Sequence, residues 1–379
     1  MLLVKNTKIY TMANSIIENG DILVKDGKIT EIGENLTCEG AEIVQGEGLI
    51  ALPGFIDAHS HIGGFNFNVK NSDDVNEMTN VTTAHMEAIY SVDVTSKDFE
   101  YSYKSGITSI AITPGSGNVI CGQVFATKTY GTNIFDMTIK NPISLKVALG
   151  GNPKGVYGKR NQAPMTRMSI PVIIRDLLNK SKEYMEKKEK GEKVEFNQEY
   201  EAVIPVLKKE MPMKVHCTQF DMLTAIEIAK EYGIDFSLEH AWGATDYIEE
   251  IVESGCDVAF GPIGVMRSAS GERSKIDIES VVELDNRGVN VALVTDAPIL
   301  RVDSLFHHLG EAVREGCHIE RALRMVTINP AKLMGVDHRV GSLEVGKDAD
   351  IVLFKGLPGH ETNAKAVLTI IDGKVVYAE

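Results

Sequence analysis

The sequence predicts an α/β protein with a (β/α)8 TIM barrel and a small β-sandwich domain built from both ends of the chain. Eight short β-type runs lie in the middle of the chain, and helical stretches separate the later ones. Strand-rich segments with Asp-Gly turns lie at both ends. The length of 379 residues leaves room for a second, smaller domain beside a barrel of about 250 residues.

Both ends of the chain carry hairpin signals. DILVKDGKITEIG alternates apolar and polar residues around Asp26-Gly27, and VLTIIDGKVVYAE does so around Asp372-Gly373. Because chain ends often lie close together, we expect residues 1–54 and 340–379 to form one composite β-sandwich domain. The barrel then occupies residues 55–339.

The eight central runs are ALPGFIDAHSHI, GITSIAIT, GQVFATKTY, ISLKVALG, MKVHC, DFSLEH, CDVAFGP and VNVALVTD. Several are nearly all apolar, which is typical of parallel strands buried on both faces. Amphipathic stretches such as FDMLTAIEIAKEYG end in glycine, a common helix stop. Eight runs favour a closed barrel over an open sheet. Residues 62–84 and 150–167 are rich in Gly and Asn, and we expect them to be loops over the functional face.

Composition narrows the class of partner. The formal net charge of −14 argues against nucleic acid and anionic membranes, which attract basic patches. The five cysteines show no paired short spacing, which indicates a reducing compartment. No apolar run is long enough to span a bilayer, and the first residues do not resemble a signal peptide. We expect a cytoplasmic protein that acts on a small molecule, as a monomer or a homo-oligomer.

Ligand-type residues close four of the eight runs. The first run ends with His59 and His61, and residues i and i+2 of a strand share a face. His216 closes the fifth run, His240 the sixth and Asp296 the eighth. Barrel enzymes assemble their sites at the C-terminal ends of their strands. Five such residues are improbable there by chance, so we predict a metal site.

The predicted ligands also predict a chemistry. A set made mainly of imidazoles favours a divalent transition metal, zinc above all. Such an ion lowers the pKa of bound water to about 7 and polarises a carbonyl group. Asp296 could take the proton of that water and deliver it to a leaving nitrogen. Lys146, inside the apolar fourth run, is costly to bury unless it is paired or modified. The alternative is a lysine near the strand start whose amine reaches solvent.

Several motifs together resemble the amidohydrolase superfamily over essentially the whole chain. These motifs are LPGFIDAHSHIG, the VHC of Val215–Cys217, the LEHAWG of Leu238–Gly243, the VTDAP of Val294–Pro298, and INPAKLMG followed by VGSLEVGKDADIVLF. Within the superfamily the chain is similar to the imidazolonepropionase-related group, which also includes metallo-dipeptidases. The resemblance implies a metal-dependent hydrolase that cleaves carbon–nitrogen bonds.

The resemblance also implies roles for individual residues. His59, His61, His216 and His240 would bind metal, and Asp296 would bind metal and shuttle a proton. Many members carry a lysine, carboxylated by CO2, that bridges two metals. The position of Lys146 in the fourth run is similar, so one or two ions are expected, according to whether this lysine is modified.

Substrate class is predicted from three side chains. Superfamily deaminases follow the fifth-strand histidine with a glutamate, whereas this chain has Gln219, which cannot shuttle a proton. The loop GGNPKGVYGKRNQAPMTRM carries Arg160 and Arg167, whose guanidinium groups suit a substrate carboxylate; the alternative is that they are solvated loop charges. We therefore expect hydrolysis of an amide, peptide-like or cyclic amide bond in a small, carboxylate-bearing substrate. The alternatives are a dipeptidase of the same superfamily, a deaminase, a lactonase or phosphoesterase, and a non-catalytic scaffold.

Two further features are weaker signals. The glycines of TPGSGNVICGQ leave backbone free to approach a ligand, or simply make a flexible turn. The remaining histidines fall outside the strand ends, and we expect them at the surface or as capping residues: His85, His307, His308, His318, His338 and His360.

Overall fold

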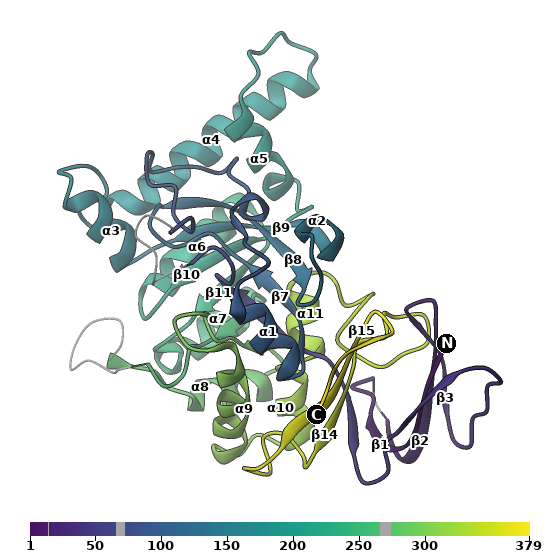
Figure 1. Ribbon diagram of the computed structural model, residues 1–379. Helices are drawn as coiled ribbons and strands as arrows, with labels where there is room; N and C mark the ends of the chain where they lie inside the picture. Colours follow the sequence, from purple (N-terminus) through teal and green to yellow (C-terminus); the bar gives the residue numbers. More distant parts are fainter. Residues whose placement is uncertain (14, 66–72, 266–273) are drawn as a thin grey trace.

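The computed structural model describes residues 1–13, 15–65, 73–265 and 274–379 of the chain. It contains two eight-stranded sheets, one at the ends of the chain and one in its middle. Strands from the two ends of the chain lie side by side in one sheet, apart from the helices and strands of the middle segment (Figure 1). No helix in the described part of the chain is both long enough and apolar enough to cross a membrane.

The terminal sheet joins the two ends of the chain. Its strands are β1 (Leu2–Tyr10), β2 (Ile16–Lys25), β3 (Lys28–Gly33), β4 (Glu42–Gln45), β5 (Ile50–Pro53), β14 (Ile351–Lys355), β15 (Lys365–Ile371) and β16 (Lys374–Ala378). Their order is β16-β15-β14-β5-β1-β2-β3, with β4 beside β1. The antiparallel pair β5–β14 connects the N-terminal strands to the C-terminal ones. A separate terminal sheet is consistent with the predicted β-sandwich, whose exact boundaries stay a prediction.

Both predicted hairpin turns are confirmed. Asp26 and Gly27 connect β2 to β3 with φ of 50° and 78°. Asp372 and Gly373 connect β15 to β16 with φ of 48° and 74°. Two successive positive φ angles match the twist of the flanking strands, and an aspartate followed by a glycine tolerates them.

The central sheet contains all eight predicted runs. Its strands are β6 (Phe55–Ser60), β7 (Ile107–Ile112), β8 (Ile120–Lys128), β9 (Thr138–Ala148), β10 (Met213–Cys217), β11 (Phe236–His240), β12 (Asp257–Phe260) and β13 (Val291–Leu293). They follow one another in sequence order. One part of the prediction is wrong, because β8 runs antiparallel to both β7 and β9.

The sheet returns to its own first strand, so it is nearly barrel-like. Ser60 pairs with Ala297, which follows β13, and the backbone N–H of Asp296 donates to the carbonyl of His59 at 3.1 Å. Apolar side chains from β6, β7, β8, β9 and β12 form one buried cluster, which includes Ile56, Ala58, Ala111, Val124, Ala126, Ile143 and Ala259. Residues on five strands that share one cluster indicate a filled interior.

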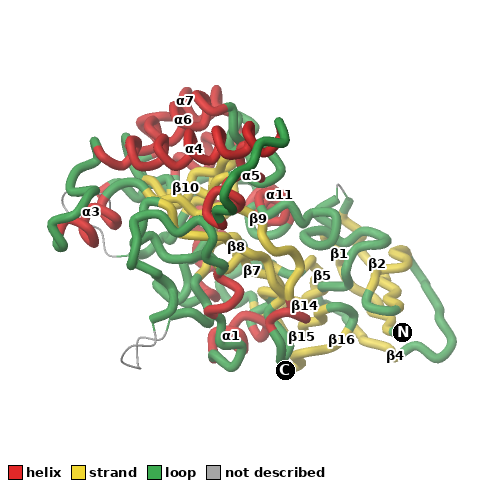
Figure 2. Tube along the Cα trace, turned by 90° about the horizontal axis from the view of Figure 1, so that it is seen from above, coloured by secondary structure: helices red, strands yellow, loops and turns green. Residues whose placement is uncertain are grey.

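The helices are α1 (Lys97–Lys104), α2 (Ile134–Met137), α3 (Gly151–Gly158), α4 (Ser169–Glu189), α5 (Gln198–Leu207), α6 (Asp221–Tyr232), α7 (Ile248–Ser254), α8 (Glu279–Asn286), α9 (Leu305–Arg314), α10 (Ile319–Arg324) and α11 (Ile328–Leu333). Helices α4, α6 and α7 lie together on one side of the central strands (Figure 2). Gly233 and Gly255 end α6 and α7 in the left-handed conformation, as predicted.

Part of one predicted loop is helical. Helix α3 lies within residues 150–167 despite three glycines, because Tyr157 is buried and its hydroxyl reaches Asn118 Oδ1 at 2.7 Å. Tertiary contact therefore outweighs the weak helix propensity of this segment. Of the other predicted loop, residues 66–72 lie outside the described residues.

A buried ion cluster connects the two sheets. Because β8 is antiparallel, its last residue, Lys128, lies at the end of the central sheet opposite to the strand ends that carry the predicted ligands. Its Nζ lies 2.7 Å from Asp350, 3.1 Å from Asp348 and 3.1 Å from Asp372. The side chain is 3% exposed. Burial alone would lower the pKa of Lys128, but the three carboxylates raise it above its ordinary value of 10.5.

Lys128→Met is expected to lower the free energy of unfolding by about 3–5 kcal/mol, because it leaves the buried carboxylate of Asp350 without its cation. Lys180→Met, which removes an exposed pair with Asp176, is the matched control and should leave the free energy of unfolding nearly unchanged. Urea denaturation of both variants measures the difference. A loss below about 1 kcal/mol in Lys128→Met would mean that this cluster does not stabilise the contact between the sheets.

The stabilisation has a defined pH window. The raised pKa of Lys128 means that its contribution is present below its unfolded value of 10.5 and is lost as pH rises through the folded pKa. Burial raises the pKa of Asp348, but Lys128 and its other cationic partners lower it below its ordinary value of 3.8. Its contribution is therefore present above pH 3.8 and is lost as pH falls. Asp350, the partner at 2.7 Å, differs, because burial raises its pKa above 3.8 although Lys128 lowers it. The difference between wild type and Lys128→Met should therefore be largest above the pKa of Asp350 and below that of Lys128.

Candidate metal centre

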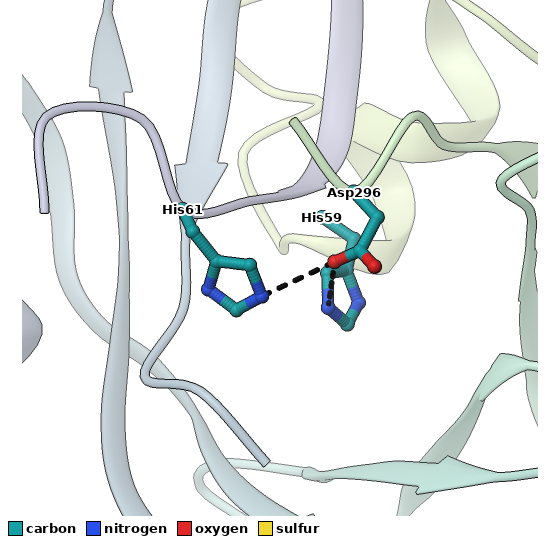
Figure 3. Close-up of side chains that lie close together, drawn as sticks. All are labelled: His59, His61 and Asp296. Atoms are coloured by element: carbon teal, nitrogen blue, oxygen red, sulfur yellow. Dashed lines mark ion pairs between the residues drawn. The ribbon is translucent and has the colours of Figure 1, made fainter. Parts of the chain in front are cut away.

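Three predicted ligands meet at the C-terminal edge of the central sheet. His59 lies in β6, His61 directly follows it, and Asp296 lies three residues after β13. Asp296 Oδ1 is 3.1 Å from His61 Nε2 and 3.6 Å from His59 Nε2 (Figure 3). One ligand atom of each residue lies within 4.8 Å of the others. This spacing lets a single ion contact all three side chains.

The other predicted ligands continue from this group. The ring of His240, at the end of β11, lies 4.7 Å from that of His59, and the ring of His216 in β10 lies 4.4 Å from that of His240. Lys146 in β9 places Nζ 3.1 Å from His59 Nε2. The structure therefore brings all six predicted metal-site residues together.

The hydrogen bonds of three imidazoles fix which nitrogen faces the site. His61 Nδ1 lies 2.7 Å from the carbonyl of Thr113, and His240 Nδ1 lies 2.8 Å from that of Gly261. His59 Nδ1 lies 2.6 Å from a carboxylate oxygen of Glu239. Carbonyl and carboxylate oxygens accept, so each Nδ1 carries the proton and each Nε2 keeps its lone pair.

Burial keeps these imidazoles uncharged. It lowers the pKa of His59 and His216 well below the ordinary value, and that of His240 below it. Burial alone would raise the pKa of Asp296, but contact with His61 and the nearby charges lower it below its usual range. The site therefore combines the uncharged imidazoles of His59, His216 and His240 with one carboxylate.

Lone pairs converge here without a proton between them. His61 Nε2 and Asp296 Oδ1 face each other at 3.1 Å, although the proton of His61 is committed to Thr113. Asp296 Oδ1 is buried, and no donor among the described residues makes a well-aligned hydrogen bond to it. Two acceptors at this distance repel each other unless a cation lies between them. The residues therefore fit a divalent metal.

A buried group of charged residues holds His59 in place. Glu239 contacts His59 through one oxygen, which also pairs with Lys214 Nζ at 2.7 Å. Its other oxygen accepts from the Ser237 hydroxyl at 2.6 Å. A carboxylate behind a metal-binding imidazole fixes its tautomer and its orientation. Glu239 and Lys214 were not among the residues predicted from the sequence, although charged residues inside apolar strands are the same signal that identified Lys146.

A second buried carboxylate connects the first and last strands at the site. Asp57 accepts from the backbone N–H of His59 at 3.1 Å and from the Thr295 hydroxyl. Burial raises the pKa of Asp57 to about 7. The bonds of Asp57 hold the residue next to Asp296 against β6, so they fix the spacing of the two ligand-bearing segments.

The backbone is strained at several site positions. His240 has φ of 69°, Asp296 of 57° and Gln219 of 52°. Such left-handed conformations are uncommon outside glycine and gather at functional sites, where the surrounding structure maintains them.

The predicted substrate-binding residues have different surroundings. Arg167 Nε lies 2.9 Å and 3.0 Å from the two carboxylate oxygens of Asp221. Gln219 Nε2 donates to the Ser274 hydroxyl at 3.1 Å. Arg160 is exposed, packs over the Tyr157 ring and lines a cavity. The role of all three in binding substrate stays a prediction.

The prediction for one further histidine is wrong. His308 in α9 is fully buried rather than a surface or capping residue, and its Nε2 lies 2.8 Å from the carbonyl of Ile263. Burial lowers the pKa of His308 to about 4. His308 is a core residue that contacts a backbone carbonyl. A search for ligand-type residues at strand ends does not reveal this role.

Comparison with known proteins supports the geometry. Residues 216–376 match the profile of the amidohydrolase family. The crystal structure of an amidohydrolase from Thermotoga maritima MSB8 has 35% sequence identity and a TM-score of 0.95, with all of both chains covered.

Two curated proteins are more distant relatives. The imidazolonepropionase of Geobacillus sp. (strain WCH70) is 27% identical over 89% of this chain and 84% of its own length. The amidohydrolase tasK of Hapsidospora irregularis is 25% identical over 93% of this chain, but the match spans only 39% of that protein. The structural match and the ligand-bearing strand ends lead to one conclusion: the chain belongs to the amidohydrolase family.

Proposed function

We propose that this chain is a metal-dependent amidohydrolase that cleaves a C–N bond of a small, carboxylate-bearing substrate, with zinc as its metal. The observation that carries the proposal is the set of inward-facing lone pairs of His59, His61 and Asp296, whose imidazole protons are committed elsewhere. A divalent ion bound there would lower the pKa of water to about 7 and polarise the scissile carbonyl.

The protein's own groups supply the proton transfers. Asp296 is the ionised carboxylate of the site, because its pKa lies below the usual range. It can accept a proton from the attacking water and return it to the leaving nitrogen. Glu239 keeps His59 oriented during these steps through the 2.6 Å contact with Nδ1.

Amide hydrolysis is preferred to deamination on the basis of one residue. The relatives of this chain include curated deaminases at 24–25% identity as well as the imidazolonepropionase. Gln219 follows the β10 histidine by three residues and presents an amide, which neither gains nor loses a proton near neutral pH and so cannot act as a general acid or base. This favours an amide, peptide-like or cyclic amide substrate.

The test is a metal analysis joined to an activity screen. Protein purified without chelator is expected to contain about one zinc ion per chain or more. It should hydrolyse members of a panel of N-acyl amino acids, dipeptides and cyclic amides. Removal of the metal should abolish turnover, and added zinc should restore it. Activity that persists in metal-free protein would contradict the proposal, and turnover confined to lactones, phosphoesters or aminopurines would assign another reaction.

A further inference from the structure

A cavity of about 580 Å³ is lined by residues of the β7–β8 connection and of helix α3. Three segments contribute side chains to it: Asn76, Ser116 from the β7–β8 connection, and Asn152, Lys159 and Arg160 from α3 and its C-terminal end. Asn152 Nδ2 donates to Ser116 Oγ at 2.7 Å, which joins two of these segments. A cavity of this size accommodates a substrate group rather than a single water molecule.

The cavity is positively charged on a strongly acidic chain. Lys159 and Arg160 line it, and none of the described residues that line it is acidic. The chain as a whole has a net charge of −14. Two cations without a carboxylate partner in the cavity therefore create a local preference for an anion.

Contacts of Tyr157 hold helix α3 in place, and the helix end in turn positions Lys159 and Arg160. The Tyr157 hydroxyl donates to the carbonyl of Asn80 at 2.5 Å and contacts Asn118 Oδ1 at 2.7 Å. The Arg160 guanidinium lies over the Tyr157 ring, 5.5 Å from its centroid, and Nη1 donates to the carbonyl of Met78. A guanidinium has five N–H groups, so donors remain for a carboxylate.

Glycines let the walls of the cavity approach each other. The backbone N–H of Gly117 donates to Asn76 Oδ1 at 2.8 Å. A Cβ at Gly117 would lie 2.7 Å from that same oxygen, and a Cβ at Gly115 would lie 2.4 Å from the Asn76 amide. The glycines of TPGSGNVICGQ thus let the Asn76 side chain pack closely at the cavity wall.

The cavity lies within reach of the metal centre. Thr113, whose carbonyl holds His61 Nδ1 at 2.7 Å, precedes Ser116 by three residues. Three extended residues span at most about 10 Å. The Ser116 wall of the cavity therefore lies within about that distance of the residue that holds His61. A substrate with its C–N bond at the metal could extend a carboxylate on an extended chain toward Lys159 and Arg160.

We propose that this cavity is the anion subsite of the enzyme, and that Lys159 and Arg160 bind the carboxylate of the substrate. The inference rests on the proposed function and specifies its substrate class. It adds Lys159 to the predicted Arg160, whereas Arg167, whose Nε pairs with Asp221, is not among the described residues that line this cavity.

A binding experiment tests the subsite without requiring turnover. Glutarate and its uncharged match glutaramide are titrated into wild type and into Lys159→Met/Arg160→Met. Lys154→Met, on the same helix but not lining the cavity, is the control. Glutarate should bind wild type and the control about 10- to 100-fold more tightly than the double variant. Equal affinity in all three proteins would overturn the subsite, and inorganic phosphate that binds as well as glutarate would overturn its assignment to carboxylates.

A kinetic experiment connects the subsite to catalysis. Substrates found in the screen are compared as carboxylate and carboxamide pairs, such as an N-acetyl amino acid and its amide. The double variant should lose about 10- to 100-fold in kcat/KM on the carboxylate member and little on the amide. Unchanged selectivity in an active double variant overturns the inference alone. Glutarate binding that depends on both cations, in a wild type that hydrolyses no C–N bond, contradicts the proposed function alone.

Discussion

Asp296→Asn is expected to lower kcat by about 10²–10⁴-fold while the protein stays folded, because general acid–base transfer is typically worth that much. Asparagine has nearly the size of aspartate, so the packing around residue 296 is kept. Its amide cannot accept the proton of the attacking water. The contacts of Asp296 with His61 and His59 at 3.1 Å and 3.6 Å also make it a candidate ligand, so metal content must be measured in the same sample.

Asp136→Asn is the matched control for this prediction. Asp136 lies in α2, is exposed, and is not among the predicted ligands. The control should retain wild-type turnover and metal content. An Asp296→Asn protein that holds its metal and turns over at the wild-type rate would remove Asp296 from the proton transfer. Loss of activity together with loss of metal would show that its contribution as a ligand dominates.

The metal-site residues could be predicted from the sequence because the apolar runs show where the strands end. An apolar run that ends in histidine or aspartate marks both a buried strand and its accessible end. His59, His61, His216, His240 and Asp296 all follow this pattern, and the structure places them in contact. The hydrogen-bond partners of these imidazoles come from carbonyl groups and from residues distant in sequence, which no local pattern specifies.

The direction of β8 was mispredicted although the sequence contains the relevant signal. Apolar periodicity identifies a strand but not its direction. Only residues 113–119 separate β7 from β8, whereas a parallel connection requires about a dozen residues or more. Connection length therefore predicts an antiparallel strand here. That direction is what places Lys128 among the carboxylates of the terminal sheet.

Helix α3 shows a limit of local sequence preference. Its segment contains glycines that disfavour a helix, and its stability depends on Tyr157, whose partners Asn80 and Asn118 are distant in sequence. Propensity alone predicts a loop. The consequence for function is that Lys159 and Arg160 extend from an anchored helix end rather than from an unstructured segment.

The number of metal ions depends on Lys146. Its Nζ is fully buried and lies 3.1 Å from His59 Nε2, where an ammonium group would repel a metal. Burial lowers the pKa of Lys146 to about 8, so the neutral amine is accessible near physiological pH. The nearby carboxylate of Glu239 is occupied by Lys214 at 2.7 Å and by His59. A neutral amine can add to CO2 and release one proton, which leaves a carbamate that supplies two oxygen ligands.

Lys146→Ala is therefore expected to reduce the metal content from two ions per chain to one, with most of the activity lost. The loss of a direct ligand should lower activity by at least the roughly 10- to 100-fold that is typical when a residue that only supports a ligand is removed. Small carboxylic acids such as acetate or propionate should restore part of the metal and of the turnover, because they supply the missing oxygens. Lys140→Ala, at the exposed start of the same strand, is the control and should behave as wild type. If wild type prepared with bicarbonate holds one ion and Lys146→Ala holds the same ion with unchanged activity, the centre is mononuclear and Lys146 is not a ligand.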